Sequence, residues 1–115
     1  AVSNYRGAFL PKVDYEWVII LREQFHRSFI SAITELLELL MQEEQYQQVI
    51  QYADRAIEED PCCEEAYRLA MQAFAKLGDR SAISRYYEKC TNALSKELEV
   101  EPDPLTINVF HSLMQ

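Results

Sequence analysis

The fold class follows most directly from residues 60–79, DPCCEEAYRLAMQAFAKLGD, because this stretch holds one complete helix between two helix breakers. Pro61 ends the preceding helix, since it lacks an amide proton and disfavours the helical conformation of Asp60. Gly78 closes the next helix, because glycine adopts left-handed backbone angles without strain. The apolar residues between them recur at three- and four-residue steps, at Ala66, Tyr67, Ala70, Met71 and Phe74. We therefore predict a helix from about Cys63 to Leu77 with one apolar face.

Upstream of this stretch, glycine and proline are absent from Asp14 to Asp60, so the pattern predicts two long helices separated only by the polar residues 42–45. The first helix carries apolar residues at helical steps, namely Trp17, Leu21, Phe25, Phe29, Ile33, Leu36, Leu37 and Leu40. It would be roughly 45 Å long at about 1.5 Å per residue. We expect its first half either to project or to pack under an irregular N-terminal arm, residues 1–13, which contains Gly7 and Pro11.

Downstream, Asp79 or Ser81 is expected to cap a fourth helix that continues to Leu98. The run Pro102-Asp103-Pro104 then breaks the chain and begins a terminal helix over residues 104–115. No strand pattern occurs. We therefore predict a single all-α domain, residues 1–115, built as a right-handed tetratricopeptide-like bundle of antiparallel helix pairs with about five helices.

An internal repeat supports the helix pairs. Residues 30–63 align with residues 64–97 at a shift of 34, which is the length of a tetratricopeptide unit. Under this shift Ile33 aligns with Tyr67, and Ala53 aligns with Tyr87, as packing positions of such a unit. Glu44 stands where a turn glycine is common. Each helix pair of this type buries its apolar face only by stacking on its neighbour.

Composition and charge exclude several classes of function. The chain has 115 residues and a formal net charge of −8, which disfavours direct binding to a nucleic-acid backbone. No apolar run approaches the roughly 20 residues of a membrane-spanning helix. The sequence also lacks the spacing of a zinc site, a phosphate-binding loop and any recognisable catalytic constellation. We expect neither cofactor nor metal nor enzymatic activity, and the three cysteines indicate reduced thiols in a cytoplasmic protein.

Several segments, in the same order, resemble the bacterial transcriptional activator domain of Streptomyces antibiotic regulatory proteins. They are Tyr5-Arg6-Gly7-Ala8-Phe9-Leu10-Pro11, Tyr15-Glu16-Trp17-Val18, Leu21-Arg22-Glu23, residues 60–71, Leu77-Gly78-Asp79-Arg80, and Tyr87-Glu88-Lys89-Cys90 through residues 98–104. One departure is Glu99, where the family usually has glycine before Val-Glu-Pro.

The resemblance implies the regulatory half of a bacterial transcription regulator, without the winged-helix DNA-binding domain or receiver domain that usually precedes this module. Its expected roles are dimerisation, effector response and contact with the transcription machinery. Its expected partners are proteins: a second copy, the adjoining DNA-binding or receiver domain, and RNA polymerase. The alternative is a free-standing tetratricopeptide-type adaptor that binds a peptide.

The first helix of each tetratricopeptide-like pair lines the inner groove, so its polar and non-core positions are the predicted partner-binding residues. These are Thr34, Glu38, Met41, Glu65, Arg68, Gln72 and Lys76. Arg68, Gln72 and Lys76 recur every four residues and would form a polar ridge that binds a carboxylate or an acidic peptide. The alternative interpretation of this ridge is an ordinary solvated helix face.

Two further candidate sites come from aromatic residues and from cysteines. Tyr15, Trp17 and Phe25 either pack the arm onto the first helix or form an interface with a second copy or a DNA-binding domain. Cys62 and Cys63 lie where a helix begins, which would lower a thiol pKa and suit redox sensing. The neighbouring carboxylates Glu64 and Glu65 oppose thiolate formation, so redox sensing is the less favoured alternative.

Overall fold

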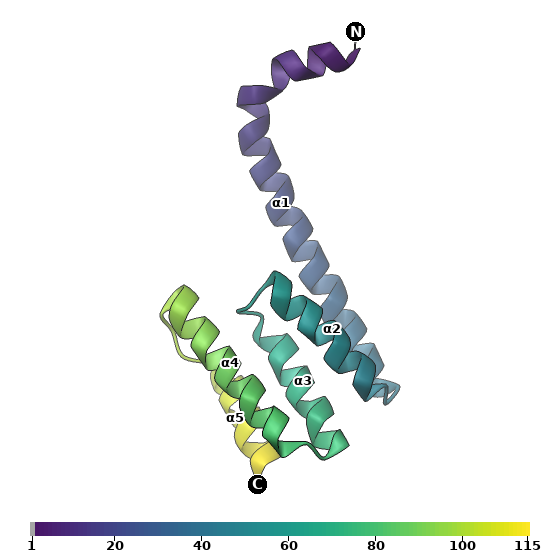
Figure 1. Cartoon of the computed structure of the whole chain (residues 1–115), viewed down its shortest axis with the longest axis vertical. Helices are drawn as coiled ribbons and strands as arrows, with labels where there is room; N and C mark the ends of the chain where they lie inside the picture. Colours follow the sequence, from purple (N-terminus) through teal and green to yellow (C-terminus); the bar gives the residue numbers. More distant parts are fainter. Residues whose placement is uncertain (1) are drawn as a thin grey trace.

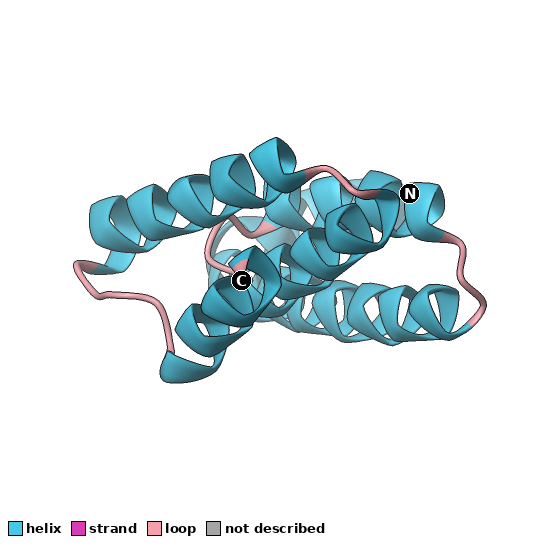
Figure 2. Cartoon of the chain, turned by 90° about the horizontal axis from the view of Figure 1, so that it is seen from below, coloured by secondary structure: helices cyan, strands magenta, loops and turns pink. Residues whose placement is uncertain are grey.

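The computed structural model describes the backbone of residues 2–115 and the side chains of residues 15–115. This part of the chain contains five helices and no strand (Figures 1 and 2). The helices are α1 (Val2–Gln42), α2 (Tyr46–Glu59), α3 (Glu64–Leu77), α4 (Arg80–Leu98) and α5 (Pro104–Met114). The prediction of an all-α helical bundle is confirmed.

The ends of α3, α4 and α5 form where the sequence places its local signals. Gly78 ends α3 in the left-handed conformation, with φ 79°. The Asp79 carboxylate accepts a hydrogen bond from the Ala82 amide at 3.0 Å, so it caps the N-terminus of α4. The Asp103 carboxylate accepts from the Leu105 amide at 2.9 Å and caps α5, which starts with Pro104. These caps satisfy amide groups that would otherwise lack a partner at each helix start.

Two non-glycine residues, Glu44 and Glu99, also adopt left-handed backbone angles, with φ of 56° and 54°. Glu44 lies in the turn between α1 and α2 and is 34 residues before Gly78, which ends the first helix of the next pair. Glu99 ends α4. The angles explain why glycine is usual at both positions: a side chain in this region costs about 1–2 kcal/mol.

The central helix of the bundle is α3, which packs against each of the other four helices. Five of its side chains are buried, at Ala66, Tyr67, Ala70, Met71 and Ala73. Around them the core continues through Ile33 and Leu37 of α1, Val49 and Ala53 of α2, and Cys90 and Leu94 of α4. Alanines at the helix contacts allow the backbones of neighbouring helices to approach closely.

The molecule is elongated because the N-terminal half of α1 extends beyond the bundle (Figure 1). Its dimensions are 64 × 34 × 18 Å, and its radius of gyration is 18.3 Å. A compact chain of this length would have a radius of gyration of about 13 Å. Of the two arrangements expected for this half of α1, the structure shows the projecting one.

The helix α1 begins at Val2, so the backbone of residues 2–13 is helical where the sequence predicts an irregular arm. Gly7 and Pro11 suggest an irregular arm, but a proline inside a helix removes one hydrogen bond and bends the helix without having to end it. Figure 1 shows α1 bending in its N-terminal part.

Candidate functional site

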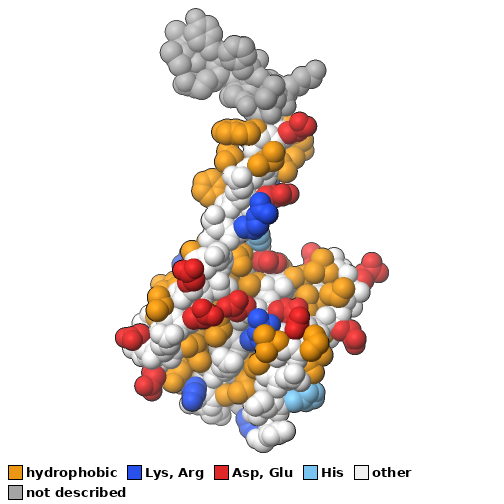
Figure 3. All heavy atoms as spheres, turned by 180° about the vertical axis from the view of Figure 1, so that it is seen from behind, with side chains coloured by type: hydrophobic (Ala, Val, Ile, Leu, Met, Phe, Trp, Pro, Cys, Tyr) orange, Lys and Arg blue, Asp and Glu red, His pale blue; other side chains and the backbone are white. Residues whose placement is uncertain are grey.

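A groove of about 420 Å³ lies between α1, α3 and α5. Its lining residues are Glu38, Glu65, Arg68, Leu69, Gln72, Leu105 and Val109. We call this the α1–α3–α5 groove. Four of the seven predicted partner-binding residues therefore meet in one place, from two different helices. Seen from behind, the bundle shows acidic side chains and a basic one side by side among apolar side chains (Figure 3).

A chain of hydrogen bonds at the edge of this groove holds α5 against α3. The Arg68 guanidinium donates to the Thr106 hydroxyl at 2.8 Å, and that hydroxyl donates to the Glu64 carboxylate at 2.7 Å. The same Glu64 oxygen accepts from the Asp103 amide at 2.8 Å. Thr106 is completely buried, so its hydroxyl has no access to water and depends on these two partners.

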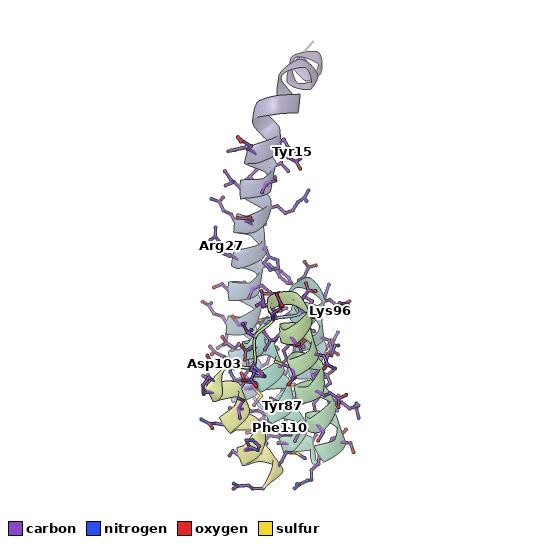
Figure 4. The ribbon with its side chains drawn as sticks, turned by 90° about the vertical axis from the view of Figure 1, so that its left-hand side faces the viewer. Tyr15, Arg27, Tyr87, Lys96, Asp103 and Phe110 are labelled. Atoms are coloured by element: carbon purple, nitrogen blue, oxygen red, sulfur yellow. The ribbon has the colours of Figure 1, made fainter. Side chains whose placement is uncertain are left out.

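A second contact fixes α5 to α4. The rings of Tyr87 and Phe110 stack with centroids 3.9 Å apart and an interplanar angle of 9°. Both residues are labelled in Figure 4. The wall of the groove that α5 contributes is therefore held from two sides. A groove with a fixed wall loses little conformational entropy when a partner binds.

The structure changes the interpretation of the predicted polar ridge. The guanidinium of Arg68 is already bonded inside the molecule, and Lys76 is exposed in the last turn of α3 and does not line the groove. Only Gln72 of the three ridge residues is left in the groove without an internal partner among the hydrogen bonds found. An acidic peptide would therefore find no free cation among the described residues that line the groove.

The carboxyl groups that the groove does present are those of Glu38 and Glu65, from α1 and α3. Burial raises the pKa of Glu65, and the hydrogen bond and negative charge of Glu38 raise it further. The nearby positive charge of Arg68 opposes this shift. Because two acidic side chains lie side by side here, this part of the groove favours a positively charged group of a partner.

The other three predicted partner-binding residues lie outside the groove. The Thr34 hydroxyl donates to the Ile30 carbonyl at 2.9 Å in its own helix, and Met41 packs against the core. Sequence reasoning missed the apolar side of the groove, formed by Leu69, Leu105 and Val109. The four-residue spacing of Leu105 and Val109 indicates one face of the terminal helix, but nothing local shows which helix that face meets.

The predicted interface residues Tyr15, Trp17 and Phe25 lie on the projecting half of α1, with side chains exposed to 69%, 57% and 71%. Figure 4 shows Tyr15 far from the bundle. None of the three belongs to the core around α3. Their exposure favours the interpretation as an interface with another protein over that as packing residues.

The cysteines are placed poorly for redox chemistry. Cys62, Cys63 and Cys90 are free thiols, and Cys63 and Cys90 are buried. Burial raises the pKa of Cys62 and of Cys63, and the charge of Asp60 raises both further. Burial also raises the pKa of Cys90 to about 12. Because the thiolate is the reactive form, these shifts oppose the sensing role considered for Cys62 and Cys63.

Among residues 15–115, no group of three or more His, Cys, Asp or Glu side chains is placed to hold a metal ion. Within the described helices, none combines the length and apolar character required to cross a bilayer.

Stacked helix pairs around a central helix, with a groove beside them, define a helical module of the tetratricopeptide-like type. The family model of the bacterial transcriptional activator domain matches residues 1–114, and the chain belongs to this family. The resemblance of the sequence to this domain is thereby confirmed, and the family is a regulatory one, not a family of enzymes. Comparisons with curated proteins and with solved structures found no match to the chain.

Proposed function

We propose that the chain is a cytoplasmic protein-interaction module of a bacterial transcription regulator and that it binds a partner protein in the α1–α3–α5 groove. The proposal rests on one observation: Glu38, Glu65 and Gln72 line the same groove as the apolar residues of α5. Membership of a transcription-regulator family supports the biological setting. We expect the partner to be RNA polymerase or the DNA-binding domain of the same regulator.

The chemistry of the groove defines the segment that fits it. Leu69, Leu105 and Val109 offer apolar surface, and Leu105 is 55% exposed, so a partner gains by covering it. Glu38 and Glu65 accept hydrogen bonds or a positive charge. We therefore expect a partner segment with an apolar side chain next to a lysine or arginine, in place of the acidic peptide that the sequence suggested.

The net charge of −8 also favours a partner with a basic surface. A negatively charged module attracts a basic surface from a distance, and dissolved salt screens this attraction within about 10 Å at 0.1 M ionic strength. Association with the partner should therefore be faster at low salt than at high salt. The salt dependence should be weaker once Glu38 and Glu65 are both replaced by glutamine.

The proposal is tested with purified bacterial RNA polymerase holoenzyme as the probe, immobilised in a binding assay with the whole chain in solution. Leu105→Asp and Glu38→Lys should each weaken binding by about tenfold or more, because they place charge on the apolar wall or reverse the charge of the groove. The matched control is Leu98→Asp, since Leu98 is exposed to 58% at the end of α4, outside the groove. Equal losses for Leu105→Asp and Leu98→Asp would overturn the groove as the binding site.

The alternative function is a free-standing adaptor for a peptide. The apolar wall of the groove would serve such a ligand equally well, so the partner distinguishes the two functions. A chain that fails to bind the polymerase and the regulator's DNA-binding domain, yet binds a basic apolar peptide in the groove, would support the adaptor and overturn the transcriptional role.

A further inference from the structure

The helix α1 carries two apolar faces, of which only one is used within the molecule. Ile33 and Leu37, exposed to 6% and 0%, face the bundle. A second stripe lies to one side of this face and borders α2 at Ala32 and Leu36; it consists of Val18, Leu21, Phe25, Ala32, Leu36 and Leu39. Phe25 and Leu39 are exposed to 71% and 58%. Apolar side chains also follow the projecting part of the molecule in Figure 3. Within the described part of the chain, no helix covers this stripe.

The spacing of the stripe is that of a helix that pairs with another helix. Val18, Phe25, Ala32 and Leu39 recur every seven residues. A seven-residue apolar repeat keeps one seam of a helix against its partner over several turns, as in coiled coils. The seam from Val18 to Leu39 is roughly 32 Å long at about 1.5 Å per residue. The occupant that fits it is therefore another long helix with a matching seam.

The same spacing is symmetric along the chain, which makes the stripe complementary to itself in the antiparallel direction. The steps between consecutive members are three, four, seven, four and three residues. When two copies meet antiparallel about a centre between residues 28 and 29, Val18 lies opposite Leu39, and Leu21 lies opposite Leu36. Phe25, with the largest exposed ring of the stripe, then lies opposite Ala32, its smallest side chain. A parallel pair would instead set Phe25 against Phe25 and leave a gap at Ala32.

The surface beside Ala32 is shaped to receive such a ring. A shallow groove of about 300 Å³ lies between α1 and α2 and includes Phe29, Ala32, Leu36 and Tyr52. In the antiparallel arrangement, the projecting half of one α1 lies along this groove of the other copy. Each copy thus covers the part of its partner that extends beyond the bundle in Figure 1.

The area is sufficient for a dimer. The exposed part of the stripe amounts to about 500 Å² per copy, so pairing covers about 1,000 Å², which is the lower bound for a specific interface. The Phe29 and Tyr52 side chains at the edge of the seam add to this area.

We propose that α1 pairs antiparallel with α1 of a second copy through Val18, Leu21, Phe25, Ala32, Leu36 and Leu39. The inference rests on the proposed function as a protein-interaction module and names a second copy as one partner. It uses the stripe on α1 and leaves the α1–α3–α5 groove of each copy for the other partner.

The oligomeric state of the whole chain, measured by sedimentation equilibrium from about 1 to 100 µM, tests the pairing. We expect a dimer for the natural chain and a dissociation constant raised by roughly 30-fold or more for Phe25→Glu. The matched control is Ile20→Glu, because Ile20 lies on the same projecting half, is 51% exposed and is outside the stripe. Leu39→Glu, at the other end of the stripe, should act like Phe25→Glu. A natural chain that stays monomeric, or equal effects of Phe25→Glu and Ile20→Glu, would overturn the proposal.

The antiparallel direction has its own test in the double variant Val18→Cys/Leu39→Cys. Mild oxidation should join residue 18 of one copy to residue 39 of the other, which mass spectrometry of the linked peptides identifies. Links from 18 to 18 and from 39 to 39 would contradict the proposed direction. If the pairing fails, the proposed function is still tested separately by comparing polymerase binding of the Leu105→Asp and Leu98→Asp variants.

Discussion

At the residue scale, the left-handed backbone angles of Glu44, Gly78 and Glu99 make a prediction about stability. Gly78→Ala should lower the free energy of unfolding by about 1–2 kcal/mol, because a side chain at φ 79° is strained although nothing lies within 4 Å of the added carbon. Glu44→Gly and Glu99→Gly should raise it by up to about 1 kcal/mol, after the entropy that glycine loses on folding. Urea unfolding of the three variants measures these differences. A loss of stability in both glutamate variants would contradict the turn angles.

Also at this scale, the raised pKa of Glu65 predicts a stability that depends on pH. A carboxyl group whose pKa is higher in the folded chain holds its proton more tightly there, so the free energy of unfolding falls as pH rises above about 4.5 and through the raised value. Glu65→Gln should therefore be more stable than the natural chain at pH 7 and equal to it at pH 4 or below.

Unfolding curves between pH 3 and pH 8 test this difference. Glu38→Gln should act in the same direction, since the charge of Glu38 contributes to the shift. Glu35→Gln, an exposed position on the same helix, provides the control and should leave the pH dependence unchanged. An identical pH dependence in the Glu65→Gln variant and the natural chain would contradict the raised pKa of Glu65.

At the element scale, the buried hydroxyl of Thr106 predicts how firmly α5 is held. Thr106→Val keeps the shape of the side chain but leaves Arg68 without its acceptor and Glu64 without one donor. Losing these partners should cost about 1–3 kcal/mol and increase amide hydrogen exchange within α5. Thr106→Ser retains the hydroxyl and should keep exchange in α5 slow. If both variants exchange equally fast, packing at this position, and not the hydrogen bonds, holds α5.

At the scale of the whole molecule, the projecting half of α1 and the bundle should differ in their contribution to stability. Trp17 is 57% exposed, so Trp17→Ala should change the free energy of unfolding of the monomer by less than about 0.5 kcal/mol. Leu37 is fully buried, and Leu37→Ala should cost about 2–5 kcal/mol. Thermal unfolding at low protein concentration makes the comparison. A large loss for Trp17→Ala would show that the projecting half is packed against the bundle.

The sequence by itself determined the class of the fold and most helix boundaries, because the signals are local. Pro61, Gly78 and the Asp103-Pro104 pair act on neighbouring backbone groups, and the helices start or end beside them. The interval of 34 residues separates the starts of α2 and α4. The order of short motifs along the chain was enough to indicate the family, and the helical period identified four of the residues that line the groove.

Only the tertiary structure decided what those residues do. Within its own helix, Arg68 has the place of a free cation. In the folded chain its guanidinium donates a hydrogen bond to Thr106, which is 38 positions later. The apolar residues of α1 form one pattern in the sequence, yet they divide into a face on the bundle and an unpartnered stripe. Charge pairing and burial depend on distances between helices, and a helical period fixes only the relations within one helix.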